Sequence, residues 1–280
     1  MGVGSCRGPC SRKAGPIFMK YTWSVWPMLG RKICSKKTKL LILDFDGTLT
    51  AIAKTPSDVV LETRTREVLT QLSQLPFCKL AIVSGRALED LTSFFHIKNI
   101  FYAGNHGLEL KGKGVSLPPR AKKAKKMEAL VWLLGEKLKE DFSKVPGIFI
   151  EDKNYTLSLH YRNIPREYYP FFKQEVDLFR KKYAEWPLIW KKGKKVWDVH
   201  PGVKWDKGDV ALHLAKKFPE ALPIVIGDDV TDEDMFKVLK HRGITIRVGG
   251  SKKSLADYYL KSSADVRNFL GVLCRLIRQS

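Results

Sequence analysis

Residues 40–50 read LLILDFDGTLT, and this stretch decides the fold. Its first four residues are apolar without interruption, which is typical of a parallel strand buried on both faces. The run ends in Asp44 and Asp46, at the point where open α/β sheets place their chemistry. Two carboxylates one residue apart in an extended chain point the same way and repel each other, so they indicate a bound cation such as Mg²⁺ or a shared proton. With a divalent ion present, one carboxylate can attack an electrophile while the other moves a proton.

Three further apolar runs end in the same manner. Residues 80–83 lead into Ser84, residues 100–103 into Gly104-Asn105-His106-Gly107, and residues 222–226 into Gly227 and the acidic residues Asp228, Asp229 and Asp232. Helical patterns separate these runs, which predicts a parallel sheet with all its strand ends at one edge. We therefore expect the polar side chains at these ends to converge.

Four of these elements resemble the motifs of haloacid dehalogenase superfamily phosphatases. They are the Asp-x-Asp-Gly-Thr element at 44–48, the strand end at Ser84, Lys207 within WDKG at 205–208, and the acidic stretch at 227–232. More narrowly, YAGNHGLE at 102–109, KVWDVHP at 195–201 and GDDVTDED at 227–234 resemble the trehalose-phosphate phosphatase family. The resemblance covers roughly residues 38–277. It departs at Asp198 and His200, where the family usually carries Glu and Arg.

The resemblance implies an α/β fold, with a Rossmann-like parallel-sheet core and an inserted α+β cap domain of the second type. The residue pattern agrees, because Gly112, Gly114, Pro118 and Pro119 mark a linker after Glu109. Beyond it, helices over 120–141 and 166–183 and strands over 148–151, 155–161, 188–190 and 196–199 are expected, in the order αββαββ. We assign the phosphatase core to 38–111 and 201–280, the cap to 112–200, and a basic, disordered arm to 1–37.

Catalytic roles follow from the resemblance and from the chemistry of the residues. Asp44 would be the nucleophile and form an aspartyl-phosphate, while Asp46 would protonate the departing sugar oxygen and then activate water. Ser84 would donate a hydrogen bond to a phosphoryl oxygen, and Lys207 would place a positive charge beside it. Taken singly, Asp46 could instead cap the following turn, and Ser84 could be a turn residue.

The same residues suggest a Mg²⁺ site. Asp44, the backbone carbonyl of Asp46 and Asp228 would hold the ion, and Asp232 would be a further ligand or a hydrogen-bond acceptor. Asp232 could also serve only to complement the positive end of the helix that follows it.

Substrate recognition is expected at the entrance to the cap and within it. The candidates are Arg86 for phosphate or sugar, Asn105, His106 and Glu109 at the cap junction, and His160, Arg162 and Asp198 inside the cap. The function implied is a phosphoric monoester hydrolase that converts trehalose 6-phosphate to trehalose and phosphate with Mg²⁺, and a trehalose-6-phosphate synthase is a candidate partner. Another sugar phosphate, of sucrose or of glucosyl-glycerate, is the nearest alternative. A noncatalytic nucleic-acid-binding or scaffold protein is the alternative from a different class.

Composition bounds these interpretations. Hydrophobic residues make up 44% of the 280, and no apolar run approaches the ~18 residues that span a bilayer, so no membrane is expected. The five cysteines are scattered, which favours free thiols in a reducing cytoplasm, with Cys6 and Cys10 only a weak metal signal. The net charge of +21 is concentrated in residues 1–40, 111–126 and 180–195. It could bind nucleic acid or steer an anionic substrate, and since no nucleic-acid motif accompanies it, we expect no specific nucleic-acid partner.

Overall fold

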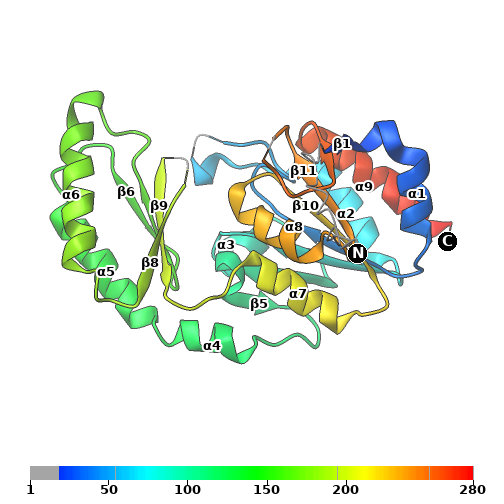
Figure 1. The fold of residues 1–280 in the computed structure, drawn as a ribbon, viewed down its shortest axis with the longest axis horizontal. Coiled ribbons are helices and arrows are strands. Elements are labelled where there is room, and N and C mark those ends of the chain that lie inside the picture. The colour runs from blue at the N-terminus through cyan, green and yellow to red at the C-terminus, as the bar shows by residue number, and fades with distance from the viewer. Residues whose placement is uncertain (1–18, 54, 194, 252, 280) are drawn as a thin grey trace, which may run out of the picture.

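The computed structural model describes residues 19–53, 55–193, 195–251 and 253–279. In these residues the chain forms two lobes, each built around its own sheet, and the carboxyl terminus lies in the larger one (Figure 1). The predicted fold class, an α/β core with an inserted α+β cap, is confirmed. No helix in the described ranges is long and apolar enough to cross a membrane.

The larger lobe contains an eight-stranded sheet among the residues described. Its strands are β1 (Lys20–Tyr21), β2 (Lys39–Leu43), β3 (Cys78–Val83), β4 (Ile100–Gly104), β5 (Glu109–Lys111), β10 (Leu222–Gly227), β11 (Ile244–Val248) and β12 (Tyr258–Leu260). They lie in the order β1-β12-β11-β10-β2-β3-β4-β5, and every pair is parallel except β4 with β5. The chain winds from β2 outward to β3 and β4 on one side and later to β10, β11 and β12 on the other. Strand β2 is therefore the topological switch point, where α/β sheets bind ligands.

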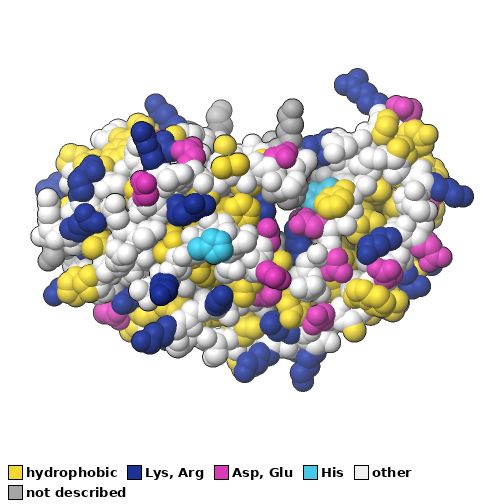
Figure 2. Space-filling model, turned by 180° about the vertical axis from the view of Figure 1, so that it is seen from behind, with side chains coloured by type: hydrophobic (Ala, Val, Ile, Leu, Met, Phe, Trp, Pro, Cys, Tyr) yellow, Lys and Arg dark blue, Asp and Glu magenta, His cyan; other side chains and the backbone are white. Residues whose placement is uncertain are grey.

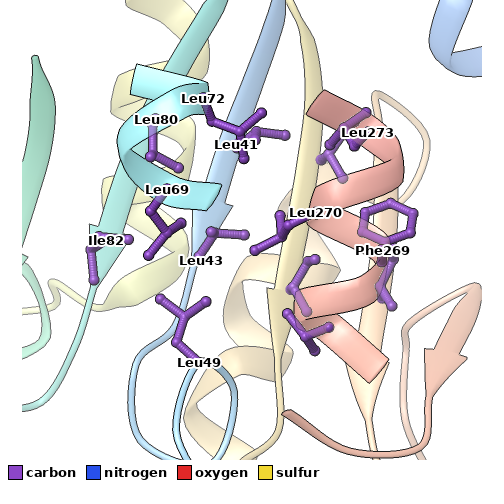
Figure 3. Close-up of a cluster of buried hydrophobic side chains, with 14 of the residues drawn as sticks. Leu41, Leu43, Leu49, Leu69, Leu72, Leu80, Ile82, Phe269, Leu270 and Leu273 are labelled. Carbon is purple, nitrogen blue, oxygen red and sulfur yellow. The ribbon is translucent and has the colours of Figure 1, made fainter. Parts of the chain in front are cut away.

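Helices cover both faces of this sheet. They are α1 (Trp26–Cys34), α2 (Thr63–Gln74), α3 (Leu88–Ser93), α7 (Lys207–Lys217), α8 (Glu233–Leu239) and α9 (Ser263–Arg278), with short 3₁₀ turns η1 (Thr22–Val25), η2 (Pro56–Asp58), η3 (Asn105–Gly107) and η5 (Val230–Asp232). Along β2, Leu41 and Leu43 face the helices α1, α2 and α9, whereas Leu40 and Ile42 face α7 and α8. Figure 3 shows the first of these two cores, with side chains of α2 and α9 meeting those of β2 and β3. Burial on both faces explains the uninterrupted apolar run at 40–43.

The smaller lobe is the cap. It comprises α4 (Pro119–Lys125), α5 (Glu128–Asp141), β6 (Phe149–Asp152), β7 (Leu157–His160), η4 (Arg166–Tyr168), α6 (Tyr169–Lys182), β8 (Leu188–Lys192) and β9 (Val196–Pro201). The strands form an antiparallel sheet in the order β6-β7-β9-β8, and α5 and α6 pack on one face of it through a separate apolar cluster. The division of the chain at 111–112 and 200–201 stays a prediction, although β9 ends at Pro201.

One predicted element differs in the cap. The helix expected over 120–141 is two helices, because α4 ends at Lys125 and Met127 leaves the helical region at φ −97°, ψ 8°. Like charges three and four residues apart at Lys122, Lys125 and Lys126 disfavour an unbroken helix at this point.

The prediction of a disordered arm over 1–37 is wrong for the residues described, and residues 1–18 lie outside them. Strand β1 pairs with β12 at the edge of the large sheet, and α1 buries Leu29 and Ile33 completely in the core. The apolar positions 23, 26, 29 and 33 all face the same cluster, at the spacing of one helical stripe. The basic residues that surround this stripe obscure it in the sequence.

We predict that Ile33→Ala lowers the free energy of unfolding by about 2–5 kcal/mol, because it leaves a cavity in a fully buried position. Arg31→Ala, which changes an exposed residue of the same helix, is the matched control. Urea denaturation followed by circular dichroism measures both. Equal stability of the two variants would contradict the assignment of α1 to the core.

Candidate active site

The carboxyl ends of the parallel strands bring the predicted residues to one edge of the sheet. Asp44 follows β2, Ser84 follows β3, Asn105 follows β4 and Asp228 follows β10. Viewed from behind, the surface is hollowed between the two lobes, and acidic side chains gather around the hollow (Figure 2). The two sheets therefore leave a cleft, and its core side carries carboxylates.

A buried ion-pair triad lies at the end of β2. The Lys207 ammonium donates to Asp44 Oδ1 at 2.7 Å and to Asp232 Oδ1 at 2.8 Å, and each of the three residues is at most 4% exposed. Lys207 reaches this position because α7 begins there, with Asp206 as its N-cap in a capping box with Asp209. Asp44 and Asp232, two of the strand-end residues expected to converge, are thus brought together, with Lys207 between them.

Asp232 also shapes the loop that carries Asp228. Its Oδ2 accepts the backbone N–H groups of Asp228 at 2.9 Å and Asp229 at 3.0 Å, so both of its oxygens have partners. Asp228 itself accepts from Thr48 Oγ1 at 3.2 Å. Gly47 has φ +85°, and a Cβ there would collide with the Asp228 carboxylate. Glycine is thus required at 47 for backbone conformation and for close approach.

Electrostatics follow from crowding and burial. Burial and the charge of Asp232 raise the pKa of Asp44 well above its ordinary value, against the opposing effect of Lys207. Burial, Asp232 and Asp229 raise the pKa of Asp228 to about 6. Burial lowers the pKa of Lys207, but the charges of Asp232 and Asp44 outweigh it, so the ammonium titrates above its usual range.

These carboxylates fit a divalent cation. One oxygen from each of Asp44, Asp228 and Asp232 lies within 4.8 Å of the others. Three carboxylates against one ammonium leave an excess of negative charge, which a hard cation with oxygen ligands would neutralise. The donor set is therefore the kind that Mg²⁺ prefers.

Asp46 and Arg86 are paired with each other. The guanidinium makes a bidentate contact with Asp46, with both N···O distances 2.7 Å, and a third bond to Asp90 at 2.8 Å. It also lies over the rings of Phe45 and Phe94. The structure thus joins the predicted acid–base residue to a residue that the sequence analysis assigned to the substrate. The buried Ser84 hydroxyl accepts the backbone N–H of Arg86 at 3.1 Å, beside this pair.

The junction residues Asn105 and Glu109 connect the core to the cap. Asn105 is fully buried; its amide group donates to Glu109 Oε2 at 2.6 Å and to the Lys153 carbonyl at 2.8 Å, while its oxygen accepts from Thr156 at 2.9 Å. Glu109 Oε2 also accepts the backbone N–H of Leu88 at the start of α3. Asn105 thus holds the β6–β7 hairpin of the cap against the core, and Glu109 fixes the Asn105 amide.

His106 follows in a left-handed conformation, with φ 54°. Its ring meets His200 of β9 with centroids 4.9 Å apart. Burial and the charges of His200 and Lys207 lower the pKa of His106 well below its ordinary value, and burial lowers the pKa of His200 to about 4. The two imidazoles are therefore neutral at pH 7 and form a second contact between core and cap.

Strand alternation places the cap candidates. Leu157, Leu159 and Val199 face the cap helices, so Ser158, His160, Asp198 and His200 lie on the opposite face, the one that meets His106. His160 bonds Glu151 at 2.8 Å and stacks on Phe149. Arg162 is exposed, two residues after the end of β7.

Sequence reasoning missed the chain of polar contacts behind Asp198. Lys153 Nζ donates to Ser158 Oγ at 2.8 Å, and Ser158 donates to Asp198 Oδ1 at 2.5 Å. Lys153 also lies 3.3 Å from Glu151. The sequence pattern that could have predicted it is the alternation of polar residues at 151, 153, 158 and 160, on either side of a turn. Such alternation places these side chains on one face of a hairpin.

We predict that Mg²⁺ affinity depends on pH through Asp228. Since its pKa is raised to about 6, the carboxylate is charged above that pH and loses its charge as the pH falls through it. Affinity should therefore be full near pH 7.5 and should fall by up to about tenfold per pH unit below 6, because protons compete with the metal. Calorimetric titrations at pH 5, 6 and 7.5 measure this, with Asp228→Asn as a control that binds weakly throughout. Equal affinity at pH 5 and 7.5 would exclude Asp228 as a ligand.

Comparison with known proteins shows the family of the chain. The family model described as trehalose-phosphatase matches residues 42–264. Trehalose-phosphate phosphatase B of Arabidopsis thaliana is 32% identical over 254 residues, which are 84% of this chain and 66% of the relative, so the chain spans slightly less than two thirds of that relative.

Solved structures give the same result. Trehalose-6-phosphate phosphatase of Aspergillus fumigatus superposes with a TM-score of 0.60 at 26% identity, covering 89% of this chain and 97% of that one. The C-terminal domain of the Candida albicans enzyme superposes with a TM-score of 0.76 at 24% identity, over 94% and 99% of the two chains, and supports the fold. The chain belongs to the trehalose-phosphatase family.

Proposed function

We propose that this protein is a Mg²⁺-dependent phosphatase that hydrolyses trehalose 6-phosphate to trehalose and inorganic phosphate. The observation that supports it most directly is the buried carboxylate Asp44 at the switch-point strand, bonded to Lys207 and flanked by Asp228 and Asp232. Phosphate ester hydrolysis needs a positioned nucleophile and positive charge around the phosphoryl oxygens, and this site has residues of both kinds.

In the first half-reaction, an oxygen of Asp44 attacks phosphorus and the bond from phosphorus to the sugar oxygen breaks, leaving an aspartyl-phosphate. Asp46 gives a proton to the departing sugar oxygen. In the second half-reaction, Asp46 takes a proton from water, whose oxygen attacks phosphorus. The bond between phosphorus and the Asp44 oxygen breaks, which releases phosphate and restores the Asp44 carboxylate. Mg²⁺ held by Asp44, Asp228, Asp232 and the carbonyl of Asp46 would draw charge from the phosphoryl oxygens when bound.

Lys207 and Ser84 have supporting roles in this scheme. Lys207, fixed between Asp44 and Asp232, keeps a positive charge beside the phosphoryl group. The Ser84 hydroxyl already accepts the Arg86 N–H, which leaves its own hydrogen for a phosphoryl oxygen. Arg86 occupies both carboxylate oxygens of Asp46 in its bidentate contact, so Asp46 must leave this contact before it gives a proton to the sugar oxygen.

The sugar would lie between the core edge and the polar face of the cap sheet. That face offers the acceptor Asp198, the donor Lys153 and the neutral imidazole of His200, a mixture that suits the hydroxyls of a disaccharide. The buried contacts of Asn105 with the hairpin set the height of the cap above Asp44.

Phosphate release from a panel of esters tests the function. Trehalose 6-phosphate should be hydrolysed with Mg²⁺ and not after chelation, and with a higher kcat/KM than sucrose 6-phosphate, glucosyl-glycerate phosphate or p-nitrophenyl phosphate. Preference for another sugar phosphate would support the proposed mechanism and refute trehalose 6-phosphate as the substrate. No release from any ester would refute the proposal.

Asp198→Ala should lower kcat/KM for trehalose 6-phosphate by about tenfold, the scale of one lost charged hydrogen bond. It should spare p-nitrophenyl phosphate, which needs only the core groups. Steady-state kinetics on both esters measure this, and Glu140→Ala, an exposed change on α5 at the opposite face of the cap sheet, is the control. An equal loss on both substrates would show that Asp198 supports the cap rather than the sugar.

The proposal includes a source of substrate and a place for the reaction. A trehalose-6-phosphate synthase would have to supply the ester, as the sequence analysis suggests. Cys34, Cys78 and Cys274 are free thiols, in keeping with the expected reducing cytoplasm.

A further inference from the structure

A cavity lies on the side of the cap sheet turned away from the core. It has a volume of about 330 Å³ and lies between α6 and the β8–β9 hairpin, where Figure 1 places α6 on the far side of these strands from the large lobe. Its lining residues are Tyr161, Tyr169, Phe172, Lys173, Val176, Asp177, Arg180, Lys192 and Trp197. None of them belongs to the site described above.

Positive charge converges in this cavity without matching negative charge. The Arg180 guanidinium carbon and the Lys192 ammonium lie 4.5 Å and 5.6 Å from the centroid of the same ring, that of Trp197. Two cations held at one indole repel each other, and Asp177 is the one carboxylate among the lining residues. It lies 3.8 Å from Arg180, at the long limit of an ion pair. The Nε of Arg180 is buried without a hydrogen-bond partner, although a buried N–H normally has one.

The walls suit a ring as well as a charge. Phe172 and Tyr161 are almost completely buried and form an apolar surface with Val176. At the rim, Lys195 lies 4.6 Å from the centroid of Tyr169 and adds a further positive charge. A volume of about 330 Å³ is within the range of small-molecule sites and much larger than a phosphate ion.

A second cavity shows that this charge is local. It also has a volume of about 330 Å³ and lies along α6, but its charged lining residues are Asp141, Glu175 and Lys182. One cavity beside α6 is therefore acidic and the other is basic. The positive charge of the basic cavity is thus a local feature and not only a result of the many lysines and arginines in the chain.

We propose that the basic cavity binds the phosphate monoester of a sugar as a second, noncatalytic ligand. Its dianionic phosphoryl group would lie between Arg180, Lys173 and Lys192, and accept hydrogen bonds from their charged groups. Its ring would lie against the aromatic wall. The proposal does not depend on the reaction at Asp44.

Calorimetric titration of the full chain with glucose 6-phosphate tests this. Asp44→Asn is used as the background, so that the ligand is not consumed. Adding Arg180→Gln should remove one binding event from the titration, and adding Lys192→Gln should weaken the same event by about tenfold or more. Lys182→Gln, which removes a charge from the same helix at the acidic cavity, should leave the titration unchanged. Glucose should not bind at this site, and inorganic phosphate should bind there more weakly than glucose 6-phosphate.

Three results would overturn the proposal. An unchanged titration in both Arg180→Gln and Lys192→Gln would show that the cavity binds nothing. An equal loss of glucose 6-phosphate binding in Lys182→Gln would show that binding depends only on the overall charge of the protein. Inorganic phosphate with the same affinity as glucose 6-phosphate would show that the cavity recognises the anion and not the sugar.

Discussion

Asp44→Asn should lower phosphate release by about 1,000-fold or more, because the amide keeps the shape of the side chain and cannot attack phosphorus. The fold should survive. Asp44 is a buried carboxylate whose pKa burial already raises, so its neutral replacement removes a charge that the site disfavours. Purified variant and wild type are compared by phosphate release from trehalose 6-phosphate at saturating Mg²⁺, and by thermal unfolding.

Asp58→Asn is the control for this substitution, since Asp58 is exposed and lies in the same segment of the core. It should match the wild type in both measurements. Near-normal turnover by Asp44→Asn would refute the covalent mechanism, whatever the effect on stability.

Lys207→Met should have the second large effect, on stability as well as turnover. It leaves Asp44 and Asp232 facing each other in a buried site without their shared cation. Breaking a buried ion pair from one side costs about 3–5 kcal/mol, so the free energy of unfolding of the metal-free protein should fall by about that amount. Urea denaturation at pH 7.5 measures it, with Lys216→Met, an exposed change on the same helix, as the control.

A second substitution separates charge from packing. Asp232→Asn added to Lys207→Met should restore part of the lost stability, because it removes one of the two unpaired charges and keeps an oxygen for the backbone N–H groups of Asp228 and Asp229. The deficit of the single variant should also shrink as the pH falls and the carboxylates take up protons. If neither Asp232→Asn nor a lower pH reduces the stability loss of Lys207→Met, the role of Lys207 is packing and not charge.

The second contact between core and cap was absent from the sequence analysis. His200 appeared there only as a departure from the family pattern, whereas the structure places its neutral ring against His106. Likewise Arg86 was expected at the phosphate or the sugar, and it is bonded to Asp46 and Asp90. The His106–His200 and Arg86–Asp46 contacts join residues at least 40 positions apart, and no local pattern specifies them. The contact of Arg86 with Asp90 is different, because it is an i,i+4 pair that helical spacing can specify.

The sequence by itself determined the core architecture and the convergence of Asp44, Asp228 and Asp232. Strands buried on both faces are continuously apolar, so the sequence marks them, and parallel strands end at one edge of the sheet. The position of each polar residue after its strand was therefore sufficient to predict that these residues meet at that edge.

The tertiary structure decided the rest. It placed α1 in the core, divided the helix over 120–141, and brought the Lys153–Ser158–Asp198 chain to the face of the cap that meets the core. These features depend on packing between residues distant in the sequence and on which face of the cap sheet is turned toward the core. The amphipathic stripe of α1 predicts only that one face of the helix is apolar, and the alternation in the hairpin predicts only that one face is polar. Neither pattern predicts which element that face packs against, because the contact forms only when distant parts of the chain fold together.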